Sequence, residues 1–322
     1  MRQKNRFINA LVIYVLVAAM LITGASLLKN TDSYVDGSPA FGSRGAEAGL
    51  VTIEGVILAS GGDPGMLGGS GGASSMRLVK EIKELSDNPS IKGIIVRIDS
   101  PGGSAAASDE IWSALRSVPD DIPVVISMGD VAASGGYYIA SAGDCIFANP
   151  ATLTGSIGVI FNMVDVSGLF EKLGISAVSL HAGEYKDIGS MSRPMTDAEK
   201  QMLQTMLNQI HEQFIARVAE GRNMSDDDVR KLATGMIYTG EQAKANKLVD
   251  EVGGFEDAFA ELEKRCGGEK LTLREPPPPS FWDMLMRGGV TANVQPAGYI
   301  DALSAFASML FLNPLAANLS VR

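Results

Sequence analysis

Ser134 is the serine of this chain whose sequence context best suits nucleophilic catalysis. It follows an apolar run at residues 123–128 that predicts a buried strand and a turn of small residues at 129–133, and it precedes a helix-like stretch at 135–140. A hydroxyl at the start of a helix lies where free backbone N–H groups and the helix dipole stabilise developing negative charge. An ordinary helix-capping serine has the same surroundings, so the local sequence supports both roles.

Lys186 and His181 are the candidate bases for such a serine. A serine nucleophile needs a base, and the chain holds only two histidines, of which His211 lies in a predicted amphipathic helix. A Ser–Lys pair is the other known arrangement, and Lys186 lies in a turn-rich stretch, 183–189, after a predicted strand at 176–180. A lysine acts as a base only when burial keeps its amine neutral, and a solvated surface lysine would have the same local sequence.

Gly102 and Gly103 could supply backbone donors to the same site, because they follow a predicted buried strand at 91–98. Glycine lets a backbone N–H approach a substrate oxygen closely, although a tight turn uses glycine equally. Ser70 matches the GxSxG pattern of a nucleophile, but its glycine-rich surroundings lack the strand and helix that this pattern requires. Asp187, next to the candidate lysine, is interpreted as a solvated carboxylate.

Several other chemistries are disfavoured by composition and spacing. The chain has no Gly-Lys dipeptide, no GxGxxG and no HExxH motif, which argues against common nucleotide-binding loops and a histidine-based metal site. Its net charge of −10 argues against nucleic-acid binding, which depends on Lys and Arg. Cys145 and Cys266 are far apart and form no CxxC motif, and free thiols are expected. We expect no metal, nucleotide or other cofactor.

The central part of the 322-residue chain predicts a layered α/β core. Segments with helical spacing, at 76–85 and 105–117, alternate with short apolar runs at 91–98, 123–128 and 157–161. A long amphipathic helix begins near Thr196, and shorter helices are predicted after Ser225, at 240–247 and at 254–266. The sequence therefore predicts a sheet with helices on its faces and one long packing helix.

The N-terminus predicts a membrane anchor. Residues 7–28 carry no charge and would span about 33 Å as a helix, close to the hydrocarbon thickness of a bilayer. Three basic residues precede this segment, which predicts a cytoplasmic N-terminus and an extracytoplasmic body in a single-pass protein of the cell membrane. A cleaved signal peptide is the alternative.

Four segments follow from this organisation. Residues 1–28 form a cytoplasmic tip and the anchor, and residues 29–49 form a polar linker. Residues 50–275 form the folded domain, and residues 276–322 form a tail that begins with four prolines.

Five short motifs, in this order, closely resemble the bacterial signal peptide peptidase A family of membrane-bound serine proteases, in its short form with one catalytic unit. They are DSPGG at 99–103, AASGGYY at 132–138, LTGSIGV at 153–159, YKD at 185–187 and YTGEQA at 238–243. The resemblance covers about residues 51–263. It implies a ClpP/crotonase-like fold and hydrolysis of remnant signal peptides, after their release from preproteins, by a Ser-Lys dyad.

The resemblance also assigns roles to residues of this chain. It implies that Ser134 is the nucleophile, that Lys186 is the general base, and that Ser156 orients the lysine. By analogy with ClpP-like folds, the N–H groups of Gly103 and Gly135 form the oxyanion hole, with Gly102 as the alternative to Gly103.

Assembly is a further implication of the resemblance. Family members form a dome-like ring whose dyads are completed between neighbouring subunits, so we expect a homo-oligomer, an octamer, acting on peptide substrates.

Three alternatives stay open: a membrane protease that cuts segments of membrane proteins, a crotonase-like enzyme of acyl-CoA chemistry, and an inactive membrane scaffold.

Overall fold

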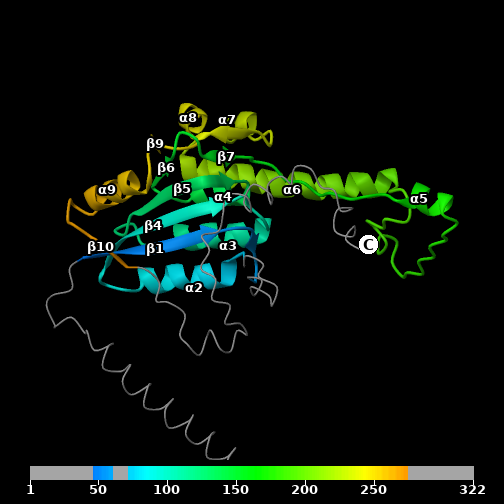
Figure 1. Ribbon diagram of the computed structural model, residues 1–322, viewed down its shortest axis with the longest axis horizontal. Helices are drawn as coiled ribbons and strands as arrows, with labels where there is room; N and C mark the ends of the chain where they lie inside the picture. The colour runs from blue at the N-terminus through cyan, green and yellow to red at the C-terminus, as the bar shows by residue number, and fades with distance from the viewer. Residues whose placement is uncertain (1–45, 61–71, 275–322) are drawn as a thin grey trace, which may run out of the picture. The chain divides into compact units, whose positions relative to one another are not determined.

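The computed structural model describes residues 46–60 and 72–274 of the chain (Figure 1). The predicted membrane segment at 7–28, most of the linker, Ser70 and the C-terminal tail lie outside these residues. Among the helices of the described ranges, none is long and apolar enough to cross a bilayer.

An eight-stranded sheet forms the centre of the described domain. Its six main strands are parallel neighbours in the order β10-β1-β4-β5-β6-β9. The two middle strands, β4 and β5, are buried at most of their positions, as expected for a parallel sheet covered on both faces. In chain order the six are β1 (Glu47–Glu54), β4 (Ile91–Ser100), β5 (Val124–Ala133), β6 (Cys145–Ala148), β9 (Glu251–Val252) and β10 (Thr272–Arg274).

Helices cover the two faces of this sheet because consecutive strand residues point in opposite directions. Ile94 and Val96 face one core together with α2 (Ser75–Ser86), α3 (Ala105–Arg116) and α4 (Gly135–Ala140). Ile95 faces a second core with α9 (Phe255–Arg265). The predicted layered α/β architecture is therefore confirmed.

Strand β5 is longer than the sequence predicts, and this places the site. Residues 129–133 were predicted as a turn, but they continue the strand to Ala133. The added residues pair with β7 (Leu153–Gly155), and Ala132 also pairs with Ser100 of β4. Small residues suit this stretch because a methyl group on Gly129 would lie 3.0 Å from the Asp99 side chain.

The long helix α6 (Asp197–Arg222) packs on the core only through its C-terminal half. Its N-terminus is fixed by a capping box between Thr196 and Glu199. Figure 1 shows α6 extending away from the sheet toward α5 (Ser167–Lys172). The predicted strands at 157–161 and 176–180 are wrong, because both stretches are irregular chain.

The remaining elements are short. They are β2 (Ile57–Leu58), β3 (Ala73–Ser74), α7 (Asp226–Leu232), β8 (Ile237–Thr239) and α8 (Gly240–Ala245). Strand β8 pairs antiparallel with β7 and so forms one wall beside the end of β5.

Candidate active site

Ser134 lies at the junction between β5 and α4, in a backbone conformation that L-residues rarely adopt. Its φ is 51° and its ψ is −119°. The conformation is held by hydrogen bonds from Ser134 N to Gly155 O, 2.8 Å, and from Tyr138 N to Ser134 O, 2.8 Å. Such strained residues cost on the order of 1–3 kcal/mol and concentrate at functional sites.

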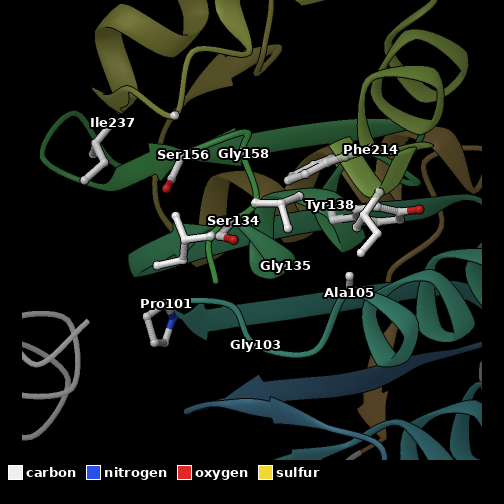
Figure 2. Close-up of a pocket in the computed structure, with 14 residues that line it drawn as sticks. Pro101, Gly103, Ala105, Ser134, Gly135, Tyr138, Ser156, Gly158, Phe214 and Ile237 are labelled. Carbon is white, nitrogen blue, oxygen red and sulfur yellow. The ribbon is translucent and has the colours of Figure 1, made fainter. Parts of the chain in front are cut away.

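The hydroxyl of Ser134 is not used by the helix that follows it. Although Ser134 is the N-cap residue of α4, its side chain makes no capping hydrogen bond. Instead it lines a pocket with Gly103, Gly135 and Ser156 (Figure 2). The ordinary capping role that the sequence left open therefore does not explain this serine.

The glycine turn after β4 presents one amide to this pocket. Gly102 N donates to the Ser100 hydroxyl at 3.1 Å, so that amide is already occupied. No described residue accepts a hydrogen bond from Gly103 N, and a methyl group on Gly135 would lie 3.2 Å from this nitrogen. Of the two glycine amides, that of Gly103 is the one without an acceptor among the described residues, and Gly135 at the start of α4 lines the same pocket.

Ser100 fixes this turn and was missed by the sequence reasoning, although it belongs to the DSPGG motif. Its buried hydroxyl accepts from Gly102 N and donates to Gly55 O at 2.6 Å. The turn is also tied to β2, because Ile57 N donates to Gly102 O at 2.9 Å. Ser100 thereby holds the peptide group between Pro101 and Gly102, and Ile57 holds the next one, from which the Gly103 N–H projects.

Ser156 lies across the pocket from the glycine turn, directly after β7. Its φ of 52° is again in the left-handed region, and its amide donates to Met236 O at 2.8 Å. Figure 2 shows Ser134 and Ser156 around the same cavity. The structure thus brings together four of the five predicted site residues.

The pocket has a volume of about 380 Å³ and mostly apolar walls. The ring of Tyr138 lies 4.7 Å from that of Phe214 on α6. The Tyr138 hydroxyl donates to Asp109 at 2.8 Å, and burial, followed by this carboxylate, raises the pKa of Tyr138. Arg217 of α6 pairs with the same carboxylate at 3.0 Å, so Asp109 connects the Tyr138 wall to α6.

Lys186 is the predicted site residue that does not reach this pocket. It is exposed on the irregular segment between α5 and α6, and His181 is exposed on the same segment. Neither of them, nor any other lysine or histidine of the described residues, lines the Ser134 pocket. Within one chain, the serine therefore has neither candidate base beside it.

Two charged residues near Lys186 were also missed or misread. Asp187, interpreted from the sequence as solvated, forms an ion pair with Arg193 at 2.9 Å. The guanidinium lowers the pKa of this carboxyl below its ordinary value. The spacing of six residues between them carries no signal in an irregular segment, so sequence reasoning could not identify the pair.

We predict that Ser100→Ala lowers kcat by about tenfold to a hundredfold with little change in KM, because the glycine turn beside Ser134 loses one of its hydrogen-bond anchors. Loss of the hydroxyl also leaves Gly55 O and Gly102 N without their partner, which costs about 1–3 kcal/mol of stability. Steady-state kinetics and thermal unfolding measure the two effects.

Ser127→Ala is the matched control. Ser127 is equally buried, and its hydroxyl accepts a hydrogen bond from Arg97 at 2.9 Å, but it lies in β5 away from the glycine turn. Equal kcat values for the two variants would contradict the assigned role of Ser100.

Comparisons with known proteins agree with the motifs. Residues 116–268 match peptidase family S49, and residues 69–152 match the Clp protease family. A candidate protease of Methanocaldococcus jannaschii is 41% identical over 183 residues, 57% of this chain and 59% of the relative. A candidate signal peptide peptidase SppA of Enterococcus faecium is 39% identical over 193 residues, 60% of this chain and 55% of the relative.

The chloroplastic serine protease SPPA of Arabidopsis thaliana is 36% identical over 208 residues, 63% of this chain and 31% of the relative. The chain thus spans little more than half the length of the first two relatives and about a third of the last. The predicted resemblance to signal peptide peptidase A and the ClpP-like character of the core are confirmed.

Proposed function

We propose that this chain, a homologue of the family S49 serine proteases, is a membrane-anchored endopeptidase that hydrolyses remnant signal peptides through a dyad of Ser134 and Lys186. The observation that carries the proposal is Ser134 itself. Its side chain makes no capping hydrogen bond and lines a mostly apolar pocket together with Gly103 and Gly135. Residues 7–28 are the proposed anchor.

The mechanism follows from these groups. The Ser134 hydroxyl attacks the scissile carbonyl, and its proton passes to neutral Lys186. The N–H groups of Gly103 and Gly135 stabilise the oxyanion. Lys186 then returns the proton to the leaving amine, and water hydrolyses the acyl-enzyme with the lysine again as base. Ser156 is proposed to orient the lysine through its hydroxyl.

The lining of the pocket supports an apolar peptide as substrate. Phe214 and Ile210 of α6 and Ile160 and Ile237 form much of its wall. A signal peptide has a hydrophobic central segment. Burial of its apolar side chains in this pocket would contribute favourable free energy to binding. No carboxylate of the described residues lines the pocket, which disfavours acyl-CoA chemistry with a Glu or Asp base.

Lys186 is proposed to act on Ser134 of a neighbouring subunit. The segment that carries it exposes large apolar side chains, of which Leu180 is 95% and Val178 is 81% exposed. Monomeric proteins rarely expose large contiguous apolar surfaces. A second copy of this chain would cover this surface and complete the dyad. A ring of eight subunits is the assembly that we propose.

We predict that Leu180→Asp reduces both assembly and peptidase activity, because a carboxylate cannot be buried in an apolar interface without large cost. Sedimentation of the full chain in detergent should show smaller species, and activity should fall in proportion. Met76→Asp is the control, since Met76 is also exposed but lies in the first turn of α2. Unchanged assembly in Leu180→Asp would show that this surface is not the interface.

Hydrolysis of a synthetic signal peptide by the full chain, followed by mass spectrometry, tests the proposed activity. Cleavage within the hydrophobic segment is the expected result. Cleavage confined to peptides from membrane proteins would change the substrate but keep the chemistry. Turnover of an acyl-CoA thioester without peptide cleavage would favour the crotonase-like alternative, and no turnover of either substrate would favour a scaffold.

A further inference from the structure

The guanidinium of Arg193 connects the segment that carries Lys186 to the start of α6. Its Nε donates to the Asp187 carboxylate at 2.9 Å, and its Nη2 donates to the backbone carbonyl of Asp187 at 2.9 Å. Nη1 and Nη2 donate to the two oxygens of Glu199 at 2.9 and 2.6 Å. With a bond from Nη1 to Pro194 O at 3.3 Å, all five N–H donors of the side chain have acceptors.

Glu199 is the fixed end of this connection. Its side chain is 5% exposed, and its carboxylate also accepts from the amide of Thr196 at 2.8 Å and from its hydroxyl at 3.0 Å. Hydrogen bonds from Arg193, and then from Thr196, lower the pKa of Glu199 to about 2. The carboxylate is therefore ionised and fully bonded, as a buried charge must be.

Asp187 is the other end, and it is adjacent to Lys186. The backbone around it is a series of turns, with bonds from Lys186 N to Gly183 O at 3.1 Å and from Ser190 N to Asp187 O at 3.2 Å. Among the described residues, every side-chain hydrogen bond that links residues 183–190 to the start of α6 passes through Arg193. Without Arg193, no side-chain hydrogen bond between described residues links these turns to the helix.

We propose that Arg193 is a positioning residue for Lys186. By holding both the side chain and the carbonyl of Asp187 against the fixed carboxylate of Glu199, it sets the direction in which the neighbouring lysine projects. A planar guanidinium suits this task because its two-sided bonding defines an orientation, whereas an ammonium provides a point charge. The inference rests on the proposed role of Lys186 as base.

Kinetics of the full chain give the first test. Arg193→Gln is expected to lower kcat about 10²-fold with KM nearly unchanged, since the substrate pocket is intact while the base is misplaced. Arg193→Lys keeps the charge and should recover only part of the loss. Arg230→Gln is the control, because it removes a two-pronged pair with Glu212 between α7 and α6, remote from residues 183–190.

Unchanged kcat in Arg193→Gln, in a protein whose Lys186→Ala variant is inactive, would overturn the proposal. A parent chain that cleaves no peptide, or an active Lys186→Ala variant, would instead contradict the proposed function. Sedimentation must show the parent assembly for each variant, so that a lost interface is not mistaken for a misplaced base.

Co-assembled chains give the second test, because they separate positioning from general destabilisation. One chain carries Ser134→Ala and donates the lysine, and the other carries Lys186→Ala and donates the serine. Arg193→Gln should abolish the shared activity when it is in the lysine donor and leave it unchanged when it is in the serine donor. Equal losses in both placements would show that Arg193 only supports the fold, and would overturn the proposal.

Discussion

Replacement of Ser134 by alanine is expected to lower kcat/KM on the order of 10⁴- to 10⁶-fold, the largest effect of any single substitution in this chain. The reason is chemical, because a serine peptidase without its nucleophile keeps only the contribution of the oxyanion hole and of substrate binding. Hydrolysis of a signal peptide, with cut sites identified by mass spectrometry, is the measurement.

The same substitution should leave stability almost unchanged. The Ser134 hydroxyl caps no helix, and alanine retains the Cβ atom at the same backbone conformation. Thermal unfolding should therefore give a Tm close to that of the parent, with Ser117→Ala on the surface end of α3 as the control. Full activity in Ser134→Ala would exclude it as nucleophile and direct attention to Ser156 in the same pocket.

The second large effect is a recovery of activity. Lys186→Ala and Ser134→Ala are each expected to be inactive alone, whereas co-expressed and co-assembled chains should regain about a quarter of the parent activity. In a ring of head-to-tail contacts that are mixed at random, about a quarter of the sites combine an intact serine with an intact lysine from the neighbour.

The expectation rests on where Lys186 lies. It is exposed on the segment between α5 and α6, and it does not line the pocket of its own chain. A dyad within one chain would give no recovery at all, because each chain lacks one of its members. Activity retained by Lys186→Ala alone would exclude the lysine and favour His181. Two tags, one on each chain, allow the mixed species to be isolated and their composition measured.

The parts of the fold that could be predicted are those with a strong local pattern. The apolar run at 91–98 became β4, and the helical spacing at 76–85 became α2, because burial of these side chains determines both elements. The strand before Ser134 and the helix after it were also predicted, although the strand continues to Ala133 and replaces the predicted turn.

The parts that could not be predicted depend on residues that are distant in the chain. Residues 129–133 read locally as a turn, and only pairing with β7 and β4 makes them strand. Ser100 acts through Gly55, forty-five positions away, so its role at the glycine turn has no local signal. In the apolar run 157–161, Ile157 is buried in the core and Val159 and Ile160 line the pocket, a mixture that periodicity cannot distinguish from a strand.

No lysine or histidine of residues 46–60 and 72–274 lines the pocket of Ser134. If the proposed dyad forms between subunits, activity depends on the concentration of the protein. A single subunit would then have Ser134 and the glycine turn in place but no lysine from a neighbour to accept the proton. It would therefore not cleave peptides before it assembles. Specific activity should rise with protein concentration and fall on dilution below the dissociation constant of the assembly. The activity of each subunit would thus increase with the concentration of the protein in the membrane.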